Sequence, residues 1–299
     1  MPLVRDNTRG ILLMNVAMLG FTVSDAFTKL STRSLPLGET IFLRGLIAAT
    51  LIGLAVIHEG SWREWRRLVD PRIVLRLIGE LGATLCYLIA LVHVPLPNVT
   101  AVFQATPLTM TVAAALFLGE RIGVRRWAAI AVGFCGVMVI VRPGLDGFDP
   151  MSLLVLASVV CVVLRDIATA RLSATIPTPL VTLATAVAVT AMGPLLIPFE
   201  SAVSLQPLWR VPNPGEIATL FLASSGLLIG YVFLIRATRL AETSAIAPFR
   251  YVLLVWAFVF GLTLFGDYPD LPTVIGAAVV VATGLYSIDS ERRARLAAA

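Results

Sequence analysis

The stretch SDAFTKLSTRSLP (Ser24–Pro36) returns later in the chain as RDIATARLSATIP (Arg165–Pro177), and this return decides the fold. Each copy closes a long apolar run. At an ungapped offset of 141 residues, polar and proline positions coincide: Asp25 with Asp166, Thr28 with Thr169, and Pro36 with Pro177. Apolar residues match by chance in any membrane protein, so these matches carry the argument. They indicate an internal duplication.

The duplication continues beyond this stretch with a slowly rising offset. Further matches follow at offsets of 144 to 148 residues: Gly82 with Gly226, Tyr87 with Tyr231, Gly119-Glu120 with Gly266-Asp267, and Gly136 with Gly284. A duplicated chain drifts in this way when its loops gain a few residues. We therefore expect two halves with the same fold.

The composition is that of a polytopic membrane protein. The 299 residues are 58% hydrophobic and 14% charged, and the mean hydropathy is +0.91. A soluble domain has about 25% charged residues. The apolar runs are far longer than the ~10 residues of a membrane β-strand, so the predicted class is all-α.

Ten membrane-length spans are predicted, at about residues 10–30, 36–57, 72–92, 97–118, 125–141, 151–174, 178–198, 214–237, 243–266 and 272–288. The first is kept as a span, although it resembles a signal peptide, because the duplication needs it. Five spans per half is an odd number, so the halves enter the bilayer from opposite sides. We expect a first repeat over 1–145, an inverted second repeat over 146–290 and a short cytoplasmic tail over 291–299.

Basic residues set the predicted orientation. With the N-terminus inside, sixteen Lys and Arg residues lie on the cytoplasmic side and four on the outer side, namely Lys29, Arg33, Arg142 and Arg210. This bias predicts an inner-membrane protein with both termini in the cytoplasm. It also accounts for the sequence pI of 9.6 without a nucleic-acid partner.

Ionisable residues inside the spans are candidates for function, because each costs about 2.5–3.5 kcal/mol at mid-helix on insertion scales. Asp25 lies toward the outer end of span one, and Arg44 lies about two turns into span two from the same side. They could pair as a gate or coupling site at the outer mouth. A structural salt bridge is the alternative.

The second half offers a mirrored pair. Asp166, the counterpart of Asp25, is expected toward the inner end of span six, with Arg250 of span nine as its possible partner. Arg165 points about 100° away from Asp166 on a helix and is expected to reach toward the inner surface.

Glu80 lies nearer the middle of span three and shares a helix face with Thr84 and Tyr87. Burial disfavours the charged form of a carboxylate, so Glu80 is a candidate for coupling transport to protons. A hydrogen-bonded structural glutamate is the alternative.

Aromatic and amide side chains supply the candidate substrate pocket. Tyr87 and Tyr231 are counterparts in the two halves, and either could line a pocket or belong to the aromatic belt at the membrane surface. The full set of substrate-binding candidates is Asn15, Tyr87, Phe103, Gln104, Tyr231, Arg250 and Trp256, with Phe249 as a further pocket residue. No metal ligand set is predicted.

Two prolines are expected to interrupt spans. Pro107 in span four and Pro248 in span nine each remove an i→i−4 hydrogen bond. Freed backbone is tolerated in a membrane where it lines a cavity. We expect these helix ends to act as gates.

The run from Gln104 to Pro107 through Gly119-Glu120-Arg121, followed by Trp127, Gly133 and Gly136, resembles the EamA repeat of the drug/metabolite transporter superfamily. Arg44 also matches an arginine common in that repeat. The resemblance implies ten helices in two inverted five-helix repeats. Length and spacing look most like the YddG-type amino-acid exporters of bacterial inner membranes. The second half departs from the pattern, since Asp267 replaces the glutamate and Pro248 is displaced.

Three functions stand at this point. The first is export of amino acids, aromatic ones included, or of similar small metabolites, by alternating access through a cavity between the repeats and driven by protons or by the solute gradient. The second is broad export of amphipathic cationic drugs. The third, a membrane enzyme, is disfavoured because the sequence has no nucleotide-binding loop, metal cluster or Ser/His pairing, and no cofactor is expected.

Overall fold

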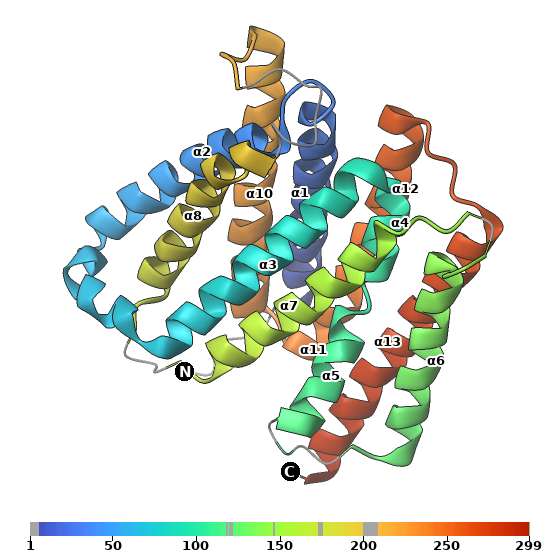
Figure 1. The fold of residues 1–299 in the computed structure, drawn as a ribbon. Coiled ribbons are helices and arrows are strands. Elements are labelled where there is room, and N and C mark those ends of the chain that lie inside the picture. Colours follow the sequence, from blue (N-terminus) through green and yellow to red (C-terminus); the bar gives the residue numbers. More distant parts are fainter. Residues whose placement is uncertain are drawn as a thin grey trace.

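The computed structural model describes residues 6–117, 119, 122–145, 147–172, 176–199 and 209–298, and this described part is helical without strands (Figure 1). Within it, ten segments are long and apolar enough to cross a bilayer. The predicted all-α polytopic class and the ten spans are therefore confirmed. Glu120 and Arg121, which are part of the run that resembles the EamA repeat, lie outside the described residues.

The first five spans are formed by α1 (Asn7–Ser31), α2 (Leu37–His58), α3 (Pro71–His93), α4 with α5 (Leu96–Phe103 and Thr106–Phe117) and α6 (Val124–Val141). The last five are formed by α7 (Ser152–Ala170), α8 (Thr178–Leu195), α10 (Pro214–Leu240), a broken segment of α11, η2, α12 and η3 (Thr243–Ile246, Ala247–Tyr251, Val252–Phe260 and Gly261–Phe265), and α13 (Leu271–Ala298).

Two regions differ from the sequence prediction. The segment between spans two and three, predicted as a loop, contains a 3₁₀ helix, η1 (Ser61–Val69). The predicted tail from residue 291 continues α13 as helix up to Ala298. Hydropathy predicts the end of a membrane span at the first charged residues. The helix itself can continue past that point, because charged residues are compatible with helical structure.

Local chemistry fixes several helix starts. Asp6 caps α1 by accepting a hydrogen bond from the Arg9 backbone N–H. Asn213 and Glu216 form a capping box at the start of α10. Each cap satisfies backbone N–H groups that the first helical turn leaves without partners.

Spans four and nine are both interrupted, as the prolines predict. Pro107 has no N–H for the carbonyl of Phe103, and that carbonyl instead accepts the Thr106 hydroxyl at 2.6 Å, in the turn between α4 and α5. Pro248 lies in the 3₁₀ segment η2 between α11 and α12. A gating role for these breaks stays a prediction.

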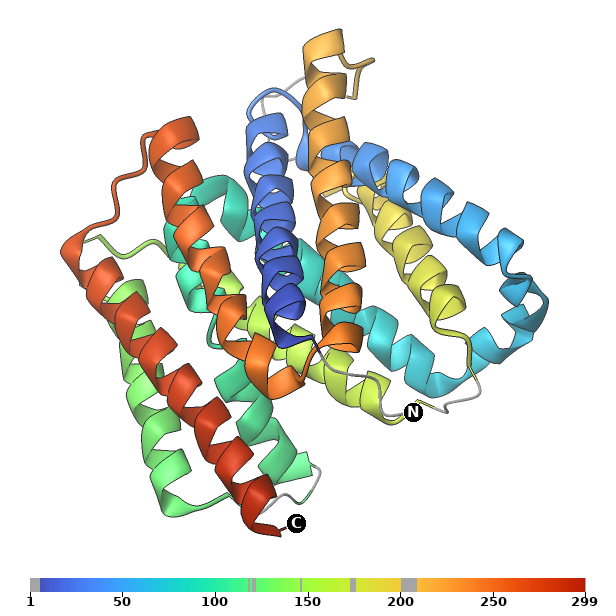
Figure 2. The same cartoon turned by 180° about the vertical axis from the view of Figure 1, so that it is seen from behind.

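Helices from the two halves of the chain lie side by side. α1 packs along α10, α3 along α7, α2 along α8, and α6 along α13 (Figures 1 and 2). α1 begins and α13 ends at the same end of the bundle. We call that end the terminal face and the other end the opposite face.

Glycines permit two of these pairs to approach closely. A Cβ on Gly20 of α1 would lie 2.8 Å from both the Gly226 carbonyl and the Gly230 nitrogen of α10. A Cβ on Gly136 of α6 would lie 3.0 Å from the Gly276 carbonyl of α13. Small residues at these points let the backbones touch, as is common between membrane helices.

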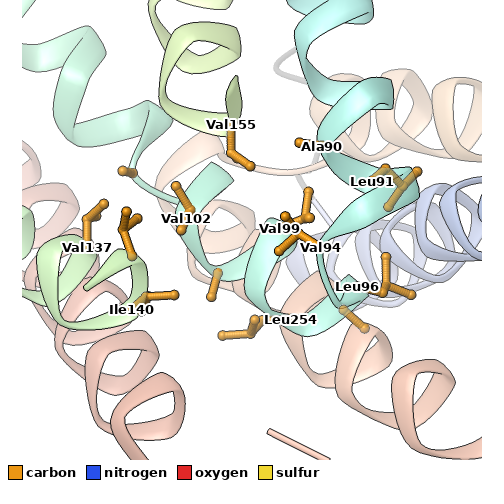
Figure 3. Close-up of a cluster of buried hydrophobic side chains, with 14 of the residues drawn as sticks. Ala90, Leu91, Val94, Leu96, Val99, Val102, Val137, Ile140, Val155 and Leu254 are labelled. Carbon is orange, nitrogen blue, oxygen red and sulfur yellow. The ribbon is translucent and has the colours of Figure 1, made fainter. Parts of the chain in front are cut away.

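The largest buried apolar cluster lies toward the opposite face. It joins the end of α3 and the start of α4, with Val94, Val99 and Val102, to Val137 of α6 and Leu254 of α12 (Figure 3). All five of these side chains are at most 6% exposed. The bundle is therefore tightly packed at this end.

Candidate functional site

Two side chains of α1 hold the guanidinium of Arg44. Arg44 lies in α2 and donates to the hydroxyls of Ser24 and Thr28, at 2.9 Å in each case. Ser24 and Thr28 are four residues apart, so they lie one above the other on a single helix face. Each of the two terminal nitrogens of the guanidinium can therefore donate to one of these hydroxyls.

Asp25 does not form the predicted direct ion pair with Arg44. Its Oδ2 instead accepts the hydroxyl of Tyr87 from α3 at 2.7 Å, and the attraction between Asp25 and Arg44 acts over a longer distance. Asp25 and Arg44 therefore lie near each other, but each is engaged by a neutral hydroxyl.

Tyr87 is an interior residue and not part of the aromatic belt. Besides its bond to Asp25, its ring meets that of Phe103 edge-on, with 5.0 Å between the ring centroids. The sequence placed Tyr87 near the membrane surface, but depth along a helix does not say whether a side chain faces lipid or protein.

A second charged group lies nearer the terminal face. Arg165 of α7 bridges two carboxylates, Glu80 of α3 at 3.2 Å and its own neighbour Asp166 at 2.9 Å. The side chain of Arg165 is 23% exposed and that of Glu80 is 15% exposed. Two predictions were therefore wrong: Arg165 does not reach toward the surface, and Asp166 pairs with it rather than with Arg250.

Arg76 extends this second group and was missed at the sequence level. It lies four residues before Glu80 on α3, and its guanidinium donates to the Thr185 hydroxyl of α8. In the sequence, Arg76 lies near the start of the predicted span 72–92 and is one of the sixteen basic residues expected on the cytoplasmic side. Its spacing from Glu80 was the available signal, because residues four apart share a helix face.

Tyr231 lies between the two groups. Its hydroxyl interacts electrostatically with charges of both, namely Arg44, Arg76, Glu80 and Arg165. Its ring meets Phe21 of α1 edge-on with 5.2 Å between centroids, and 48% of the residue is exposed.

We call this set the central polar group; its members are Asp25, Arg44, Arg76, Glu80, Tyr87, Arg165, Asp166 and Tyr231. Ionisable residues within membrane-spanning helices almost always face the bundle interior or a water-filled cavity. The central polar group is therefore the candidate site.

The two interrupted spans meet at their breaks. Gln104, which is 9% exposed, follows α4 and donates from its side chain to the backbone carbonyl of Arg250 in η2 at 3.3 Å. The Arg250 side chain is exposed. Gln104 therefore contacts the backbone carbonyl of Arg250, next to the break at Pro248. The guanidinium of Arg250, which was predicted to bind substrate, takes no part in this contact.

Asn15 and Trp256 form no hydrogen bond with the described side chains of the central polar group. Asn15 donates to the Ile11 carbonyl of its own helix at 2.9 Å. Trp256, like Phe249, packs against an apolar cluster that includes Met14, and its indole N–H has no hydrogen-bond partner among the described residues. Neither contact supports the predicted pocket role.

The comparisons with known proteins agree with this architecture. Residues 8–142 match the EamA-like transporter family. A crystal structure of a protein that is 21% identical aligns with a TM-score of 0.58 over 97% of this chain and 99% of that chain, which shows the shared fold.

Several curated relatives are transporters. The S-adenosylmethionine uptake transporter of Rickettsia conorii is 28% identical over 93% of this chain and 92% of its own length. The riboflavin transporter of Rhizobium johnstonii is 28% identical over 94% of this chain and 88% of its own. The pseudopaline exporter CntI of Pseudomonas aeruginosa is 29% identical over 91% of this chain and 93% of its own.

Proposed function

We propose that this chain, whose residues 8–142 match the EamA-like transporter family, is a secondary transporter of small zwitterionic metabolites that carry an amino-acid head group. It moves them by alternating access between the two faces of the bundle. Export of amino acids, expected from the sequence, is one case of this activity.

The observation that carries the proposal is the environment of Arg44. Its guanidinium is held by two hydroxyls, and no carboxylate of the described residues lies within 4 Å of it. A guanidinium inside a membrane is costly without an anion. A substrate carboxylate can supply that anion in a bidentate pair, for which the guanidinium fork is suited.

Asp25 is the proposed partner for the substrate ammonium. It lies near Arg44, and its one side-chain partner in the described part is the neutral phenol of Tyr87. Glu80, by contrast, is already paired with Arg165 at 3.2 Å. We therefore assign proton exchange and cation binding to Asp25 and a structural role to Glu80.

The duplication, which we retain as part of the proposal, is supported by the way the helices pair. In the duplication, α1 corresponds to α7, α2 to α8, α3 to α10 and α6 to α13. The contact between α1 and α10 therefore corresponds to the contact between α7 and α3. The α2–α8 and α6–α13 contacts each join a helix to its own counterpart. Gly119 and Gly266, counterparts at the ends of spans four and nine, both adopt positive φ, of 72° and 68°. Such an inverted arrangement is typical of secondary transporters.

Under the proposed duplication, the charges are distributed unequally. The counterpart of Arg44 is Thr185, that of Arg165 is Ser24, and that of Glu80 is Ser224. Arg44 and Arg165 thus lie on helices that are not counterparts, and neither has an arginine at its counterpart position. Arg165, nearer the terminal face, is paired with carboxylates, and Arg44, nearer the opposite face, is left for the substrate.

The names of the relatives span several solutes, and the S-adenosylmethionine transporter is the one that favours the proposed substrate class, whereas riboflavin carries no amino-acid head group. The direction of transport would follow the solute or proton gradient. The relatives' names include both uptake and export. S-adenosylmethionine contains a methionine head group, which is a zwitterion. We place the chain in the inner membrane with the terminal face in the cytoplasm, as the distribution of basic residues favours.

Purified protein in liposomes tests the proposal. We expect uptake of labelled zwitterionic amino acids or their derivatives, competition by unlabelled ones, and loss of uptake in Arg44→Met. An imposed pH gradient should change the rate in the wild type and in Glu80→Gln but not in Asp25→Asn. Transport of a cationic dye with no response to any zwitterion would contradict the proposal.

A further inference from the structure

Lys29 is a buried cation that the proposed transport site does not use. It lies in the last turn of α1, near the opposite face, and is 9% exposed. Lysine is almost never this buried unless it is paired. Its contacts therefore identify what holds it there.

The ammonium of Lys29 joins three parts of the chain. It donates to the backbone carbonyl of Val94, which follows α3, and lies 3.9 Å from Oδ2 of Asp267, which follows η3. It also stands over the ring of Phe265, 5.4 Å from the ring centroid. Oδ2 of Asp267 has no hydrogen-bond partner in the described part, so Lys29 is its nearest source of positive charge.

Lys29 and Asp25 together connect α1 with α3. They are four residues apart and share a face of α1. Asp25 accepts the hydroxyl of Tyr87, and Lys29 donates to Val94 one to two turns farther along α3. The ends of α1 and α3 near the opposite face are thus fastened by two polar contacts.

The corresponding place near the terminal face has no such fastening. The counterpart of Lys29 is Ala170, which cannot donate or pair. Asp166 is engaged by Arg165, and Tyr231 packs on Phe21. No hydrogen bond or ion pair joins the described side chains of α7 and α10.

We propose that Lys29 is a latch that holds the mouth at the opposite face closed, and that its ammonium must leave Val94 and Asp267 before this mouth opens. The proposal rests on the proposed transport function. It names a residue that positions the helices and does not touch the substrate. The apolar cluster of Figure 3 includes Val94, whose backbone carbonyl accepts the Lys29 ammonium.

Thiol labelling tests the latch. Cys86, Cys135 and Cys161 are replaced by Ala, and Ala26→Cys places the probe at a residue that is 0% exposed and adjacent to Asp25. A membrane-impermeant maleimide is added on the side of the opposite face. We expect Lys29→Met to raise the labelling rate about tenfold, because one charge-assisted contact is lost from the closed state alone.

Arg33→Gln is the matched control. Arg33 stands over the same Phe265 ring, 4.9 Å from the centroid, but it is exposed and forms no hydrogen bond or ion pair with Val94 or Asp267 in the described part. It should leave the rate unchanged, and Lys29→Arg should restore most of the protection. No change in Lys29→Met, or an equal rise in Arg33→Gln, overturns the latch.

Two further measurements keep the outcome unambiguous. If Lys29→Met does not yield folded protein, Asp267→Asn removes one partner and should raise labelling by a smaller factor; an unchanged rate overturns the latch. Uptake in liposomes separates this proposal from the transport function. If the wild type takes up no zwitterion but Lys29→Met is labelled faster, the proposed substrate class is wrong. The role of Lys29 in holding this mouth closed is then still supported.

Discussion

Arg44 and Arg165 carry the same charge inside the bundle but have different partners. Arg165 contacts the carboxylates of Glu80 and Asp166, whereas Arg44 contacts two hydroxyls. Removing one member of a buried ion pair leaves the other charge uncompensated, which is strongly destabilising. Removing Arg44 breaks no direct ion pair, although it also removes the longer-range attraction to Asp25.

The two arginines should therefore differ in their effect on stability. We expect Arg165→Met to lower the free energy of unfolding by about 3–5 kcal/mol, because Glu80 is left buried without its cation. Arg44→Met should cost less, about 1.5–3 kcal/mol, because it loses hydrogen bonds to two hydroxyls but leaves no directly paired carboxylate behind. Thermal unfolding in detergent measures both.

The double variant Glu80→Gln/Arg165→Met is the control for this prediction. It removes both charges and should recover part of the stability lost in Arg165→Met. If Arg44→Met proves as destabilising as Arg165→Met, then Arg44 has a structural anion in the folded protein, and its assignment to the substrate is wrong.

The sequence identified most members of the central polar group but few of their contacts. Asp25, Arg44, Glu80 and Tyr87 stood out because ionisable or polar residues are rare inside membrane spans. Their partners could not be predicted, since spacing defines a face within one helix and not the helix that the face meets. Lys29 escaped notice because a lysine at a span end is ordinarily solvated.

At the scale of the element, α1 organises the site. One of its faces holds Arg44 through Ser24 and Thr28, and the adjacent positions bind α3 through Asp25 and Lys29. A further face packs along α10 at Gly20. α1 therefore fixes the relative positions of three helices from both halves of the chain.

A methyl group at Gly20 should loosen this arrangement. Its Cβ would lie 2.8 Å from backbone atoms of Gly226 and Gly230, which cannot rotate away as a side chain can. We expect Gly20→Ala to cost about 1–3 kcal/mol, the usual range for overpacking. Gly53→Ala is the control, because the nearest atom to its Cβ would be Leu183 Cδ1 at 3.7 Å. Equal melting temperatures for the two variants would contradict the close α1–α10 contact.

Hydropathy predicted the spans well and the irregular elements poorly. The ten spans follow from long apolar runs, and the breaks near Pro107 and Pro248 follow from the missing proline N–H. The π-helical turn η3 and the helix η1 carry no comparable signal.

At the scale of the whole molecule, the proposed inversion has a direct topological consequence. Arg66 of η1 and Val211 lie in equivalent connections of the two halves, between the second and third spans of each. Both are exposed. Cysteines placed there, as Arg66→Cys and Val211→Cys, should react with an impermeant reagent from opposite sides of the membrane. Reaction from the same side would exclude an inverted second repeat.

The pairing of helices across the two halves was not predictable from one sequence. The duplication indicates which helices correspond, but not that α1 lies along α10 or α3 along α7. That pairing depends on complementary surfaces, including the glycines of α1 and α10. Because the central polar group draws on α1, α2, α3, α7 and α10, its composition follows from this pairing.

Competition in liposomes tests the central claim most directly. Uptake of a labelled zwitterionic amino acid is measured against the unlabelled compound and against the amine formed by removing its carboxylate. The amine should compete at least about tenfold less well with the wild type, because it leaves Arg44 without an anion. Arg44→Met should bind both weakly and lose this preference. Equal competition by the amine in the wild type, or an unchanged preference in Arg44→Met, would contradict the claim that Arg44 binds the substrate carboxylate.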